Sequence, residues 1–347
     1  MSRRLTIAIP TYNRAALLDS CLEQVCRQLR GHERDVEVMV FDNCSTDDTE
    51  NVVRRRQVAH PSIRYHRNDR NIGSYWNIDQ CYRKGDGEYV LVLGDDDLLL
   101  QGSLDAILRT VKTGPYGVIF LDGYGFDQDH LREAPLRQRV QRPRAYEDRT
   151  AFARRVSYFV TFVSGNVVNR SLVDPGLPSE EFAETNIGQV AWVLSAMLAA
   201  PMNAVIDGDV VAARNNKGSN YAVCEVFGKN LNRIFLHFRD IPGGAACIRA
   251  INGSLLLRFL PGLLFGIRTG RFAFEREDAY GVLVKVFRRN PSFWLFTAPV
   301  LLLPLPFASA WLFGTRIVRR ASDAIRKMRD RSQEIDGNRT TTRSPIV

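Results

Sequence analysis

A short apolar run that leads into three consecutive carboxylates constrains this 347-residue chain more than any other feature. Residues 89–93 have the apolar, β-branched composition of a buried central strand, and Asp95, Asp96 and Asp97 follow after one glycine. Three adjacent acidic side chains repel one another, so folding alone does not favour them. A divalent cation held by oxygen ligands, often with a phosphate in its coordination shell, is the usual compensation. The alternative is that this aspartate triplet caps a helix near Ser103 or forms a solvated turn.

Strand-like and helix-like segments alternate over the first part of the chain. Apolar runs typical of buried strands lie at residues 5–10, 36–41, 63–66, 89–93 and 118–121. Apolar residues at helical spacing lie between them, at residues 18–29, 74–84 and 103–112. This alternation predicts an α/β domain with a mostly parallel sheet flanked by helices. Ser45 and Asp48 have the spacing of a capping box and predict the start of a further helix.

Polar residues follow three of the predicted strands. Thr11 and Asn13 follow the first strand, Asp42 and Asn43 follow the second, and the aspartate triplet follows the fourth. A carboxylate at Asp42 can accept a hydrogen bond from a base or a ribose hydroxyl, since ligands of such sheets bind beyond the carboxyl ends of the strands. The chain contains neither a G-x-G-x-x-G motif after the first strand nor a P-loop, which leaves a metal on the triplet to hold phosphates.

Four motifs resemble those of family 2 glycosyltransferases in both order and spacing. They are residues 7–14 (IAIPTYNR), 41–49 (FDNCSTDDT), 70–77 (RNIGSYWN) and 87–97 (GEYVLVLGDDD). The resemblance implies a Rossmann-like GT-A fold, a nucleotide-diphospho-sugar donor and a Mg²⁺ or Mn²⁺ ion. It also implies an inverting transfer, by direct displacement at the anomeric carbon.

Carried over position by position, the resemblance implies a donor site and a metal site. The residues that it places around the nucleotide sugar are Pro10, Thr11, Tyr12, Asn13, Asp42, Asn71, Gly73 and Asp95. Within that set, Asp42 would contact the base and Asp95 would lie near the ribose. Asp96 would be the leading metal ligand and a catalytic residue, with Asp97 and Asp95 as the other candidate ligands. Gly94 stands where many members have the first aspartate of an Asp-x-Asp motif, so the pair of carboxylates that meets the metal stays open.

The acceptor hydroxyl needs a general base within hydrogen-bonding reach. The densest acidic stretch of the second half contains Glu180, Glu181 and Glu184, ahead of a helix predicted at residues 186–199. Glu184 is our first candidate for the base and Glu181 the second. The alternative is that these acidic residues only interact favourably with the helix dipole. Trp76 and Trp192 lie at helical positions, and we interpret both as core residues rather than sugar-stacking platforms.

The C-terminal third of the chain is apolar and basic. Residues 255–265 are strongly apolar, and residues 293–313 contain no charged side chain, although three prolines interrupt them. About 20 apolar residues can cross a bilayer, but the prolines and the basic residues on both flanks favour a re-entrant or in-plane element. Residues 317–328 predict a basic amphipathic helix that would lie on anionic lipid. The alternative is a hydrophobic subdomain packed on the catalytic part, or a dimer interface.

Charge and cysteine content indicate where such a protein works. The net charge of +9 gathers in residues 123–150, a predicted loop or lid, and in the C-terminal tail rather than among exposed aromatics, which argues against nucleic acid as a partner. The six cysteines include no CxxC pair and no signal peptide is recognisable, which predicts a reducing, cytosolic compartment. We therefore expect a peripheral or monotopic protein on the cytoplasmic face of the inner (plasma) membrane.

We expect four parts in the chain. Residues 1–122 would form the nucleotide-sugar-binding half of one domain, and residues 123–240 would form its acceptor half. Residues 241–335 would form a helical, membrane-associating extension, and residues 336–347 would form a disordered tail. The predicted acceptor is a saccharide, or a polyprenyl-linked saccharide as in bacterial surface polysaccharide assembly, a role that the resemblance permits. The rival functions are a sugar-phosphate nucleotidyltransferase, which usually needs a Gly-rich basic loop that is missing here, and a basic nucleic-acid-binding protein.

Overall fold

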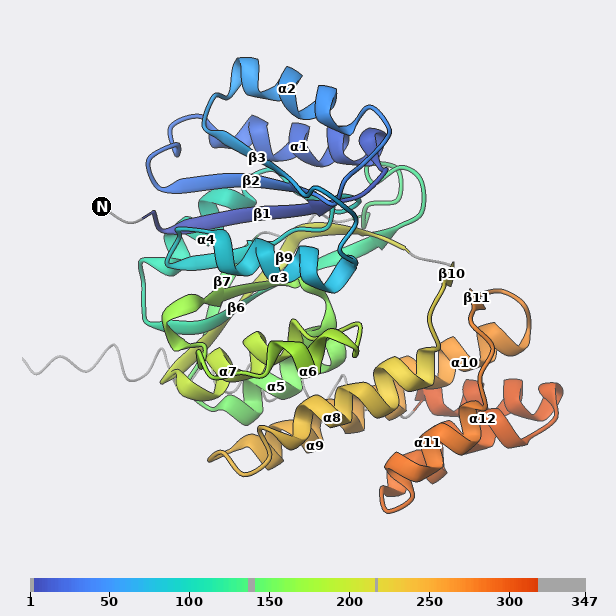
Figure 1. Ribbon diagram of the computed structural model, residues 1–347. Coiled ribbons are helices and arrows are strands. Elements are labelled where there is room, and N and C mark those ends of the chain that lie inside the picture. The colour runs from blue at the N-terminus through green and yellow to red at the C-terminus, as the bar shows by residue number, and fades with distance from the viewer. Residues whose placement is uncertain (1–2, 137–140, 216–217, 318–347) are drawn as a thin grey trace, which may run out of the picture.

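A nine-stranded sheet forms the centre of the molecule in the computed structural model, which describes residues 3–136, 141–215 and 218–317 (Figure 1). The strand order is β3-β2-β1-β4-β8-β6-β9-β5, and β7 also pairs with β9. Helices cover both faces of the sheet, and a group of further helices lies below it in Figure 1. The predicted α/β architecture with a helical, apolar C-terminal segment is confirmed.

The first half of the sheet is parallel. Its strands are β1 (Leu5–Thr11), β2 (Val36–Asp42), β3 (Ile63–Arg67) and β4 (Tyr89–Val92), followed by the short β5 (Leu98–Leu99). The helices between them are α1 (Ala15–Leu29), α2 (Thr49–Ala59), α3 (Ser74–Lys84) and α4 (Ser103–Val111). Because β1 pairs in parallel with both β2 and β4, the polar residues that follow these strands lie at one edge of the sheet. The strands and helices predicted here are confirmed to within three residues, except the helix start discussed below.

The second half of the sheet is mixed. Its strands are β6 (Tyr116–Phe126), β7 (Arg142–Tyr146), β8 (Asn166–Asn169) and β9 (Met202–Arg214), and its helices are α5 (Arg149–Val156), α6 (Ser179–Ala183) and α7 (Val190–Ala199). β8 lies antiparallel between β4 and β6, and β9 is parallel to β6. The sequence did not predict β9. It also did not predict β7, an edge strand with exposed arginines, which occupies part of the predicted loop or lid.

The C-terminal helices pack against α5 and α7, the helices of the second half of the sheet. They are α8 (Leu231–Leu236), α9 (Gly244–Ser254), η5 (Leu255–Phe259), α10 (Leu260–Arg268), α11 (Ala279–Phe287), η6 (Phe293–Thr297), α12 (Ala298–Leu302) and a helix over residues 305–317. One hydrophobic cluster includes Phe152 of α5, Leu194 of α7, Leu256 of η5 and Phe293 of η6, all of them fully buried. The apolar core therefore continues across the predicted boundary at residue 240. Residues 318–347, which include most of the predicted basic helix and the predicted tail, lie outside the described residues.

The predicted capping box of Ser45 and Asp48 is wrong. α2 begins at Thr49, whose backbone N–H donates a hydrogen bond to Asp47 Oδ1 at 3.1 Å. The hydroxyl oxygen of Ser45 instead accepts the backbone N–H of Asn13 at 2.8 Å. Ser45 thus joins the loops that follow β1 and β2, and this contact between loops outweighs the local cap.

Glu37 joins the opposite, amino-terminal edge of the sheet. Its buried carboxylate accepts hydrogen bonds from the hydroxyl of Thr6 at 2.9 Å and the backbone N–H of Asp86 at 3.0 Å. Arg64 also donates to it. Burial raises the pKa of Glu37, but these donors outweigh burial and hold the pKa below its ordinary value.

We expect Glu37→Gln to lower the free energy of unfolding by about 2–3 kcal/mol at pH 7, because it removes charge-assisted hydrogen bonds to buried donors. The folded-state pKa is depressed, so the carboxylate stabilises the protein above its unfolded pKa of about 4.3 and loses that effect as the pH falls through the folded value. Urea denaturation should therefore show the gap between variant and wild type narrowing below about pH 4. Asp86→Asn, an exposed partner of the same Arg64, is the control and should change stability little. A gap of constant size between pH 7 and pH 3.5 would contradict the account.

Candidate active site

The ends of β1, β2 and β4 bring the predicted site residues together. The Thr11 hydroxyl donates a hydrogen bond to Asp95 Oδ2 at 2.7 Å, across 84 residues of sequence. The Ser164 hydroxyl donates to Asp97 Oδ2 at 2.6 Å and accepts the backbone N–H of Gly94 at 2.8 Å. The loop after β4 is thus fixed on one side by β1 and on the other by the segment that precedes β8.

The aspartates of the triplet lie in different environments. Asp95 and Asp97 are buried, and burial is the main cause that raises the pKa of Asp95 to about 6 and that of Asp97 to about 7. The charge of Asp96 adds to both shifts, whereas the hydrogen bonds from Thr11 and Ser164 oppose them. The side chain of Asp96 is 32% exposed and remains accessible from the crevice. The helix-cap alternative does not hold, because the N-cap of α4 is Gly102 and the side chain that accepts a hydrogen bond from its first turn is Gln28.

A guanidinium group stands between two of these carboxylates. Arg14 Nη1 lies 3.1 Å from Asp95 Oδ1 and 3.2 Å from Asp96 Oδ2. Arg14 follows Asn13, whose φ of 51° turns the chain from β1 into α1. Half of the Arg14 side chain is exposed, so it can move without disturbing the core. Arg14 belongs to the first of the four motifs, and its position between two carboxylates is not apparent from the sequence.

The oxygens that face Arg14 form a donor set suited to a divalent cation. Mg²⁺ is commonly bound by one or two carboxylates together with substrate phosphates. Within residues 3–136, 141–215 and 218–317, no group of three or more His, Cys, Asp or Glu residues could hold an ion alone. Asp97 is already engaged, because Ser164 and the backbone N–H of Arg214 donate to its two oxygens at 2.6 and 2.9 Å. Asp95 Oδ1, by contrast, is paired among the described residues only with the half-exposed Arg14, so a cation that arrives with a diphosphate would meet Asp95 and Asp96 once Arg14 moves away.

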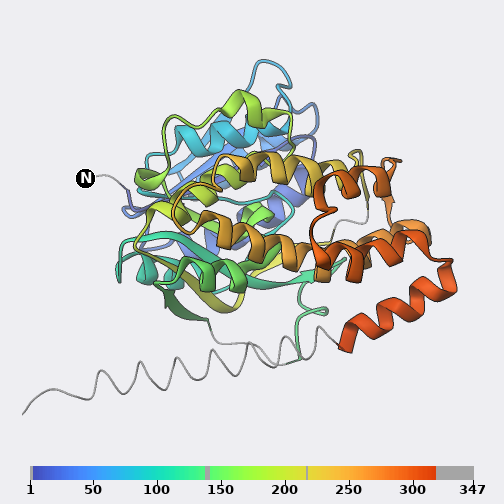
Figure 2. The ribbon, with the colours of Figure 1, turned by 90° about the horizontal axis from the view of Figure 1, so that it is seen from below.

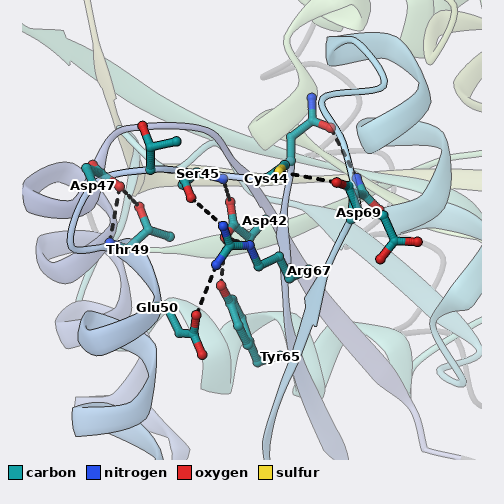
Figure 3. A network of polar contacts seen from close by, with 12 residues as sticks. Asp42, Cys44, Ser45, Asp47, Thr49, Glu50, Tyr65, Arg67 and Asp69 are labelled. Atoms are coloured by element: carbon teal, nitrogen blue, oxygen red, sulfur yellow. Dashed lines mark hydrogen bonds and ion pairs between the residues drawn. The ribbon is translucent and has the colours of Figure 1, made fainter.

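Asp42, at the end of β2, is the buried centre of a second polar network (Figure 3). One of its oxygens accepts the backbone N–H of Ser45 at 2.9 Å, and the other accepts the hydroxyl of Tyr65 at 2.6 Å. Arg67 lies 3.9 Å away and also donates to the Ser45 carbonyl at 2.8 Å. Burial first, and then the Asp42 charge, raises the pKa of Tyr65 well above its ordinary range, so its hydroxyl remains a donor. Sequence reasoning missed Tyr65 and Arg67, although Tyr65 lies on the predicted third strand and Arg67 follows it directly.

The remaining predicted donor-site residues shape the loops around the crevice. Asn71 Oδ1 accepts hydrogen bonds from the Asn43 amide at 2.8 Å and from the backbone N–H of Gly73 at 2.9 Å. Gly73 has a φ of 87°, a conformation that favours glycine. Asn13 Oδ1 accepts the backbone N–H of Thr46 at 2.8 Å, whereas Pro10 belongs to β1. The Tyr12 ring is exposed beside these loops.

Comparison with known proteins agrees with this arrangement. Residues 6–175 match the profile of glycosyl transferase family 2. This part of the chain belongs to that family. The family 2 domain thus contains β1 to β8 and every aspartate described above.

Individual relatives match shorter stretches. The chain is 32% identical over 118 residues to a GalNAc(5)-diNAcBac-PP-undecaprenol beta-1,3-glucosyltransferase of Campylobacter jejuni, covering 34% of this chain and 37% of that protein. It is 36% identical over 108 residues to the abequosyltransferase RfbV of Salmonella typhimurium, covering 30% and 32% respectively. The chain thus spans about a third of the length of these curated relatives.

A solved structure shows that the likeness in fold extends further along the chain. Staphylococcus aureus TarS 1-349 in complex with UDP superposes with a TM-score of 0.60 at 16% identity, and the match covers 90% of this chain and 88% of that one. At this identity the likeness concerns the fold alone. The GT-A fold expected for a family 2 enzyme is therefore present.

The glutamates predicted to supply the general base lie outside the strand-end crevice. Glu180 and Glu181 belong to α6, and Glu184 follows its last turn. Glu181 Oε1 accepts from Arg233 at 3.2 Å and lies 3.3 Å from His237. Burial raises the pKa of Glu181, but these donors outweigh it and lower the pKa below its ordinary value. The Glu184 side chain is 82% exposed and lies 3.8 Å from Arg233. Within the described residues no hydrogen bond or ion pair joins these glutamates to the triplet.

The two tryptophans of the family 2 fold differ in burial. Trp192 is buried and stacks on Tyr82, with ring centroids 4.3 Å apart, so its interpretation as a core residue is confirmed. Trp76 is 37% exposed, so the same interpretation is wrong for it. Helical spacing alone did not separate the two, because α3 presents one face to the sheet and another to solvent.

Proposed function

We propose that this chain is an inverting glycosyltransferase that moves a sugar from a nucleotide-diphospho-sugar to an acceptor hydroxyl. The observation that carries the proposal is the convergence of Thr11, Asp42 and the aspartate triplet at one edge of a family 2 domain. The TarS complex with UDP supports a nucleotide-sugar donor. The undecaprenol diphosphate in the name of the Campylobacter relative supports a polyprenyl-linked saccharide as acceptor, in bacterial surface polysaccharide synthesis.

Different residues at this edge of the sheet would contact different parts of the donor. Asp42, oriented by Tyr65 and Ser45, is suited to the base or ribose, whereas Thr11 holds Asp95 toward the diphosphate position. Arg14 balances the charge of Asp95 and Asp96 and would move away as the diphosphate enters. A bound Mg²⁺ or Mn²⁺, held by Asp95 and Asp96, would supply stabilisation of negative charge on the leaving diphosphate. Direct displacement needs no protein nucleophile, so the remaining requirement is a base for the acceptor hydroxyl.

The simplest test of the proposal measures nucleotide binding and turnover separately. Thermal denaturation with UDP, GDP, dTDP and ADP, with and without Mn²⁺, should show stabilisation by one of them, because a ligand that binds only the native state raises its stability. Release of nucleoside diphosphate from the matching sugar nucleotide, without any nucleoside triphosphate, would separate a glycosyltransferase from a nucleotidyltransferase. No stabilisation by any nucleotide would overturn the proposal.

Asp42→Ala should weaken donor binding more than it slows the chemical step. The expected partner of Asp42 is the nucleoside, remote from the reacting carbon, so the contact is similar in ground and transition states. We expect KM for the sugar nucleotide to rise by about tenfold or more, with kcat within about twofold. Steady-state kinetics would show this, and a fall in kcat at constant KM would contradict the nucleoside-binding role.

Glu184 is our first candidate for the general base. Glu181 is held in contacts with Arg233 and His237 that favour its ionised, weakly basic form, whereas Glu184 is largely free to reach an acceptor. Glu184→Gln should reduce transfer about 10²- to 10⁴-fold while nucleotide binding stays unchanged. Glu225→Gln, which changes another partly exposed glutamate that pairs with Lys229, is the matched control and should retain activity. Wild-type transfer by Glu184→Gln and Glu181→Gln would exclude both residues.

We further propose that the protein works on the cytoplasmic face of the inner membrane as a peripheral or monotopic protein. Among the described residues, one helix, Gly244–Arg268, is long and apolar enough to cross a membrane, but 44% of its most apolar window is buried in the protein. Residues 293–313 do not form one straight helix, because α12 ends at Leu302 and a new helix begins at residue 305. This break supports an element lying along the membrane surface rather than a simple span.

A further inference from the structure

A hollow of about 560 Å³ lies beside α3, and none of the three aspartates of the triplet lines it. Its walls come from the loop after β3 and from one side of the helix. The lining residues are Arg70, Asn71, Ile72, Trp76, Asp79 and Gln80. This volume is large enough for one or two sugar rings, since small-molecule pockets commonly enclose about 300–1,000 Å³.

The lining combines an aromatic surface with hydrogen-bonding groups. Trp76 is 37% exposed and contacts Tyr75 edge to face, with centroids 5.2 Å apart, which fixes its ring. The Gln80 amide is held by Asn68 at 3.2 Å and Lys84 at 2.8 Å. A pyranose ring has an apolar C–H face and an equatorial rim of hydroxyls, which match an aromatic face flanked by amides, a guanidinium and a carboxylate.

Asp79 adds an independent observation that points to a ligand. Its side chain is 6% exposed, and its Oδ2 accepts from Arg83 Nε at 2.6 Å. Its Oδ1 is buried and has no hydrogen-bond partner within the described residues. A buried acceptor without a donor costs free energy. A ligand hydroxyl in the hollow would supply the missing donor once the Asp79 carboxylate turns toward it.

The hollow is lined by residues 70–80 alone, and hydrogen bonds lead from this stretch to other parts of the protein. Asn71 belongs to the loop network that leads through Asn43 to the end of β2. On the other side, Arg83 contacts both Asp79 and Ser179, the first residue of α6, which carries Glu181. The hollow is therefore connected through Asn71 to the donor loops and through Asp79 and Arg83 to α6.

We propose that this hollow binds a sugar residue of the acceptor saccharide, with Trp76 as the stacking surface and Asp79 as a hydrogen-bond acceptor. The inference rests on the proposed glycosyltransferase function, because it assigns the ligand to the acceptor. It explains why an aromatic side chain is left exposed on α3 next to an unpaired buried carboxylate oxygen. Neither feature is needed to hold a nucleotide at Asp42 and the triplet.

The test uses the full-length protein and simple sugars. Saturation-transfer NMR would be recorded with the methyl β-glycosides of glucose, galactose and N-acetylglucosamine, for wild type and for Trp76→Ala. We expect Trp76→Ala to weaken the saccharide signal about tenfold, because a stacked aromatic contact is lost. Trp294→Ala removes a tryptophan that is 44% exposed on η6 and should leave the signal unchanged. Trp76→Phe should retain most of it, and if Trp76→Ala does not fold, Arg70→Ala, on the exposed loop, replaces it in the comparison.

The outcomes separate this inference from the proposed function. Nucleotide stabilisation is measured on the same variants, and we expect Trp76→Ala to retain it. The inference is wrong if Trp76→Ala and Trp294→Ala give equal saccharide signals, or if the wild type gives no signal with any glycoside. Neither result bears on nucleotide stabilisation, which tests the proposed function separately. Displacement of the glycosides by UDP-glucose or GDP-mannose, but not by UDP or GDP, would assign the hollow to the donor sugar and would also overturn the inference.

Discussion

Asp96→Asn is expected to reduce glycosyl transfer by about 10³-fold or more, since it removes a charge that faces the developing diphosphate. Asp96 is the aspartate of the triplet whose side chain remains partly exposed to the crevice, at 32%. Asp95 is anchored by Thr11, and Asp97 is anchored by Ser164 and the backbone of residue 214. Asparagine has nearly the same shape as aspartate, so the variant changes charge and little else.

The same substitution should leave the fold intact. The charge of Asp96 contributes to the raised pKa values of Asp95 and Asp97, so neutralising it relieves repulsion within the triplet. The loss of its contact with the half-exposed Arg14 opposes this gain, and such exposed pairs contribute only about 0–1 kcal/mol. We therefore expect the melting temperature without ligand to stay close to that of the wild type.

The measurement is the release of nucleoside diphosphate in the presence of acceptor, together with thermal denaturation of the apo protein. Asp105→Asn is the matched control, because Asp105 is an exposed carboxylate on α4 whose partner is His32 at 2.8 Å. That variant should retain wild-type transfer. Transfer at the wild-type rate by Asp96→Asn would remove Asp96 from the site.

Much of the first half of the fold was predictable because its signals are local. In β1, β2 and β4 nearly every residue is buried, so each strand appears as an uninterrupted apolar run ahead of a polar loop. The parallel pairing of these strands then places their polar ends at one edge, which is why Thr11, Asp42 and the triplet could be grouped from the sequence. The GT-A fold follows from the same four motifs.

The second half depended on contacts that the sequence does not show. β9 contains Asp207, Gly208 and Asp209, and its register against β6 shifts near this point, so no simple alternation marks the strand. Gly123 on β6 approaches the backbone of Val211 so closely that a side chain there would clash. Such close approach is a property of paired strands, not of either segment alone.

The roles of individual site residues depended on the same long-range contacts. Ser164 reaches Asp97 across 67 residues because β8 is inserted between β4 and β6. Arg14 lies in a motif that was recognised, but its position between two carboxylates follows from the turn at Asn13. Tyr65 and Arg67 gain their partners only when β3 pairs with β2. Residue type predicted where the site is, whereas tertiary contacts decide which atoms remain available in it.

Replacing Phe307, Trp311 and Phe313 together by serine is expected to lower binding to anionic vesicles by about 10²-fold. Each large apolar side chain contributes roughly 1.5–3 kcal/mol when it is fully buried, and part of that free energy when it enters a membrane interface. These residues lie on the helix over residues 305–317, which Figure 2 places at the outer edge of the molecule. They are 65%, 41% and 66% exposed. The helix fully buries only Ala308 and Thr315 among its described residues.

An apolar helix that is exposed over most of its circumference is unusual in water. The exposed apolar side chains continue onto the neighbouring η6 and α12, and this surface consists of Trp294, Leu295, Leu302, Leu305, Phe307, Trp311, Phe313 and Ile317. Exposed arginines lie on the same C-terminal helices and the turns next to them: Arg268, Arg271, Arg288, Arg289 and Arg316. Apolar rings accompanied by arginine suit an anionic lipid surface, where both contributions act together.

Substitution is a cleaner test than truncation at residue 240. Leu255, Leu256 and Phe293 are fully buried in the same cluster as Phe152 of the catalytic half, so removing the C-terminal helices would expose the core. The control replaces three exposed apolar residues outside this surface, Val58, Leu131 and Leu136, by serine. Their exposed fractions are at least as large, so the control matches the loss of exposed apolar area.

The two exposed tryptophans of this surface, Trp294 and Trp311, distinguish a lipid surface from a chance apolar patch. The indole N–H of Trp311 donates to the carbonyl of Leu295 at 3.0 Å, and that of Trp294 donates to the carbonyl of Arg288 at 2.9 Å. Since both polar groups are satisfied within the protein, the exposed parts of these rings are apolar and can enter lipid without leaving a donor unpaired. Sedimentation with vesicles should therefore show strong binding by the wild type and the control triple variant, and weak binding by Phe307→Ser, Trp311→Ser and Phe313→Ser combined. The membrane position would be contradicted if all three proteins bound vesicles equally. It would also be contradicted if the wild type formed a dimer through this surface and did not bind vesicles.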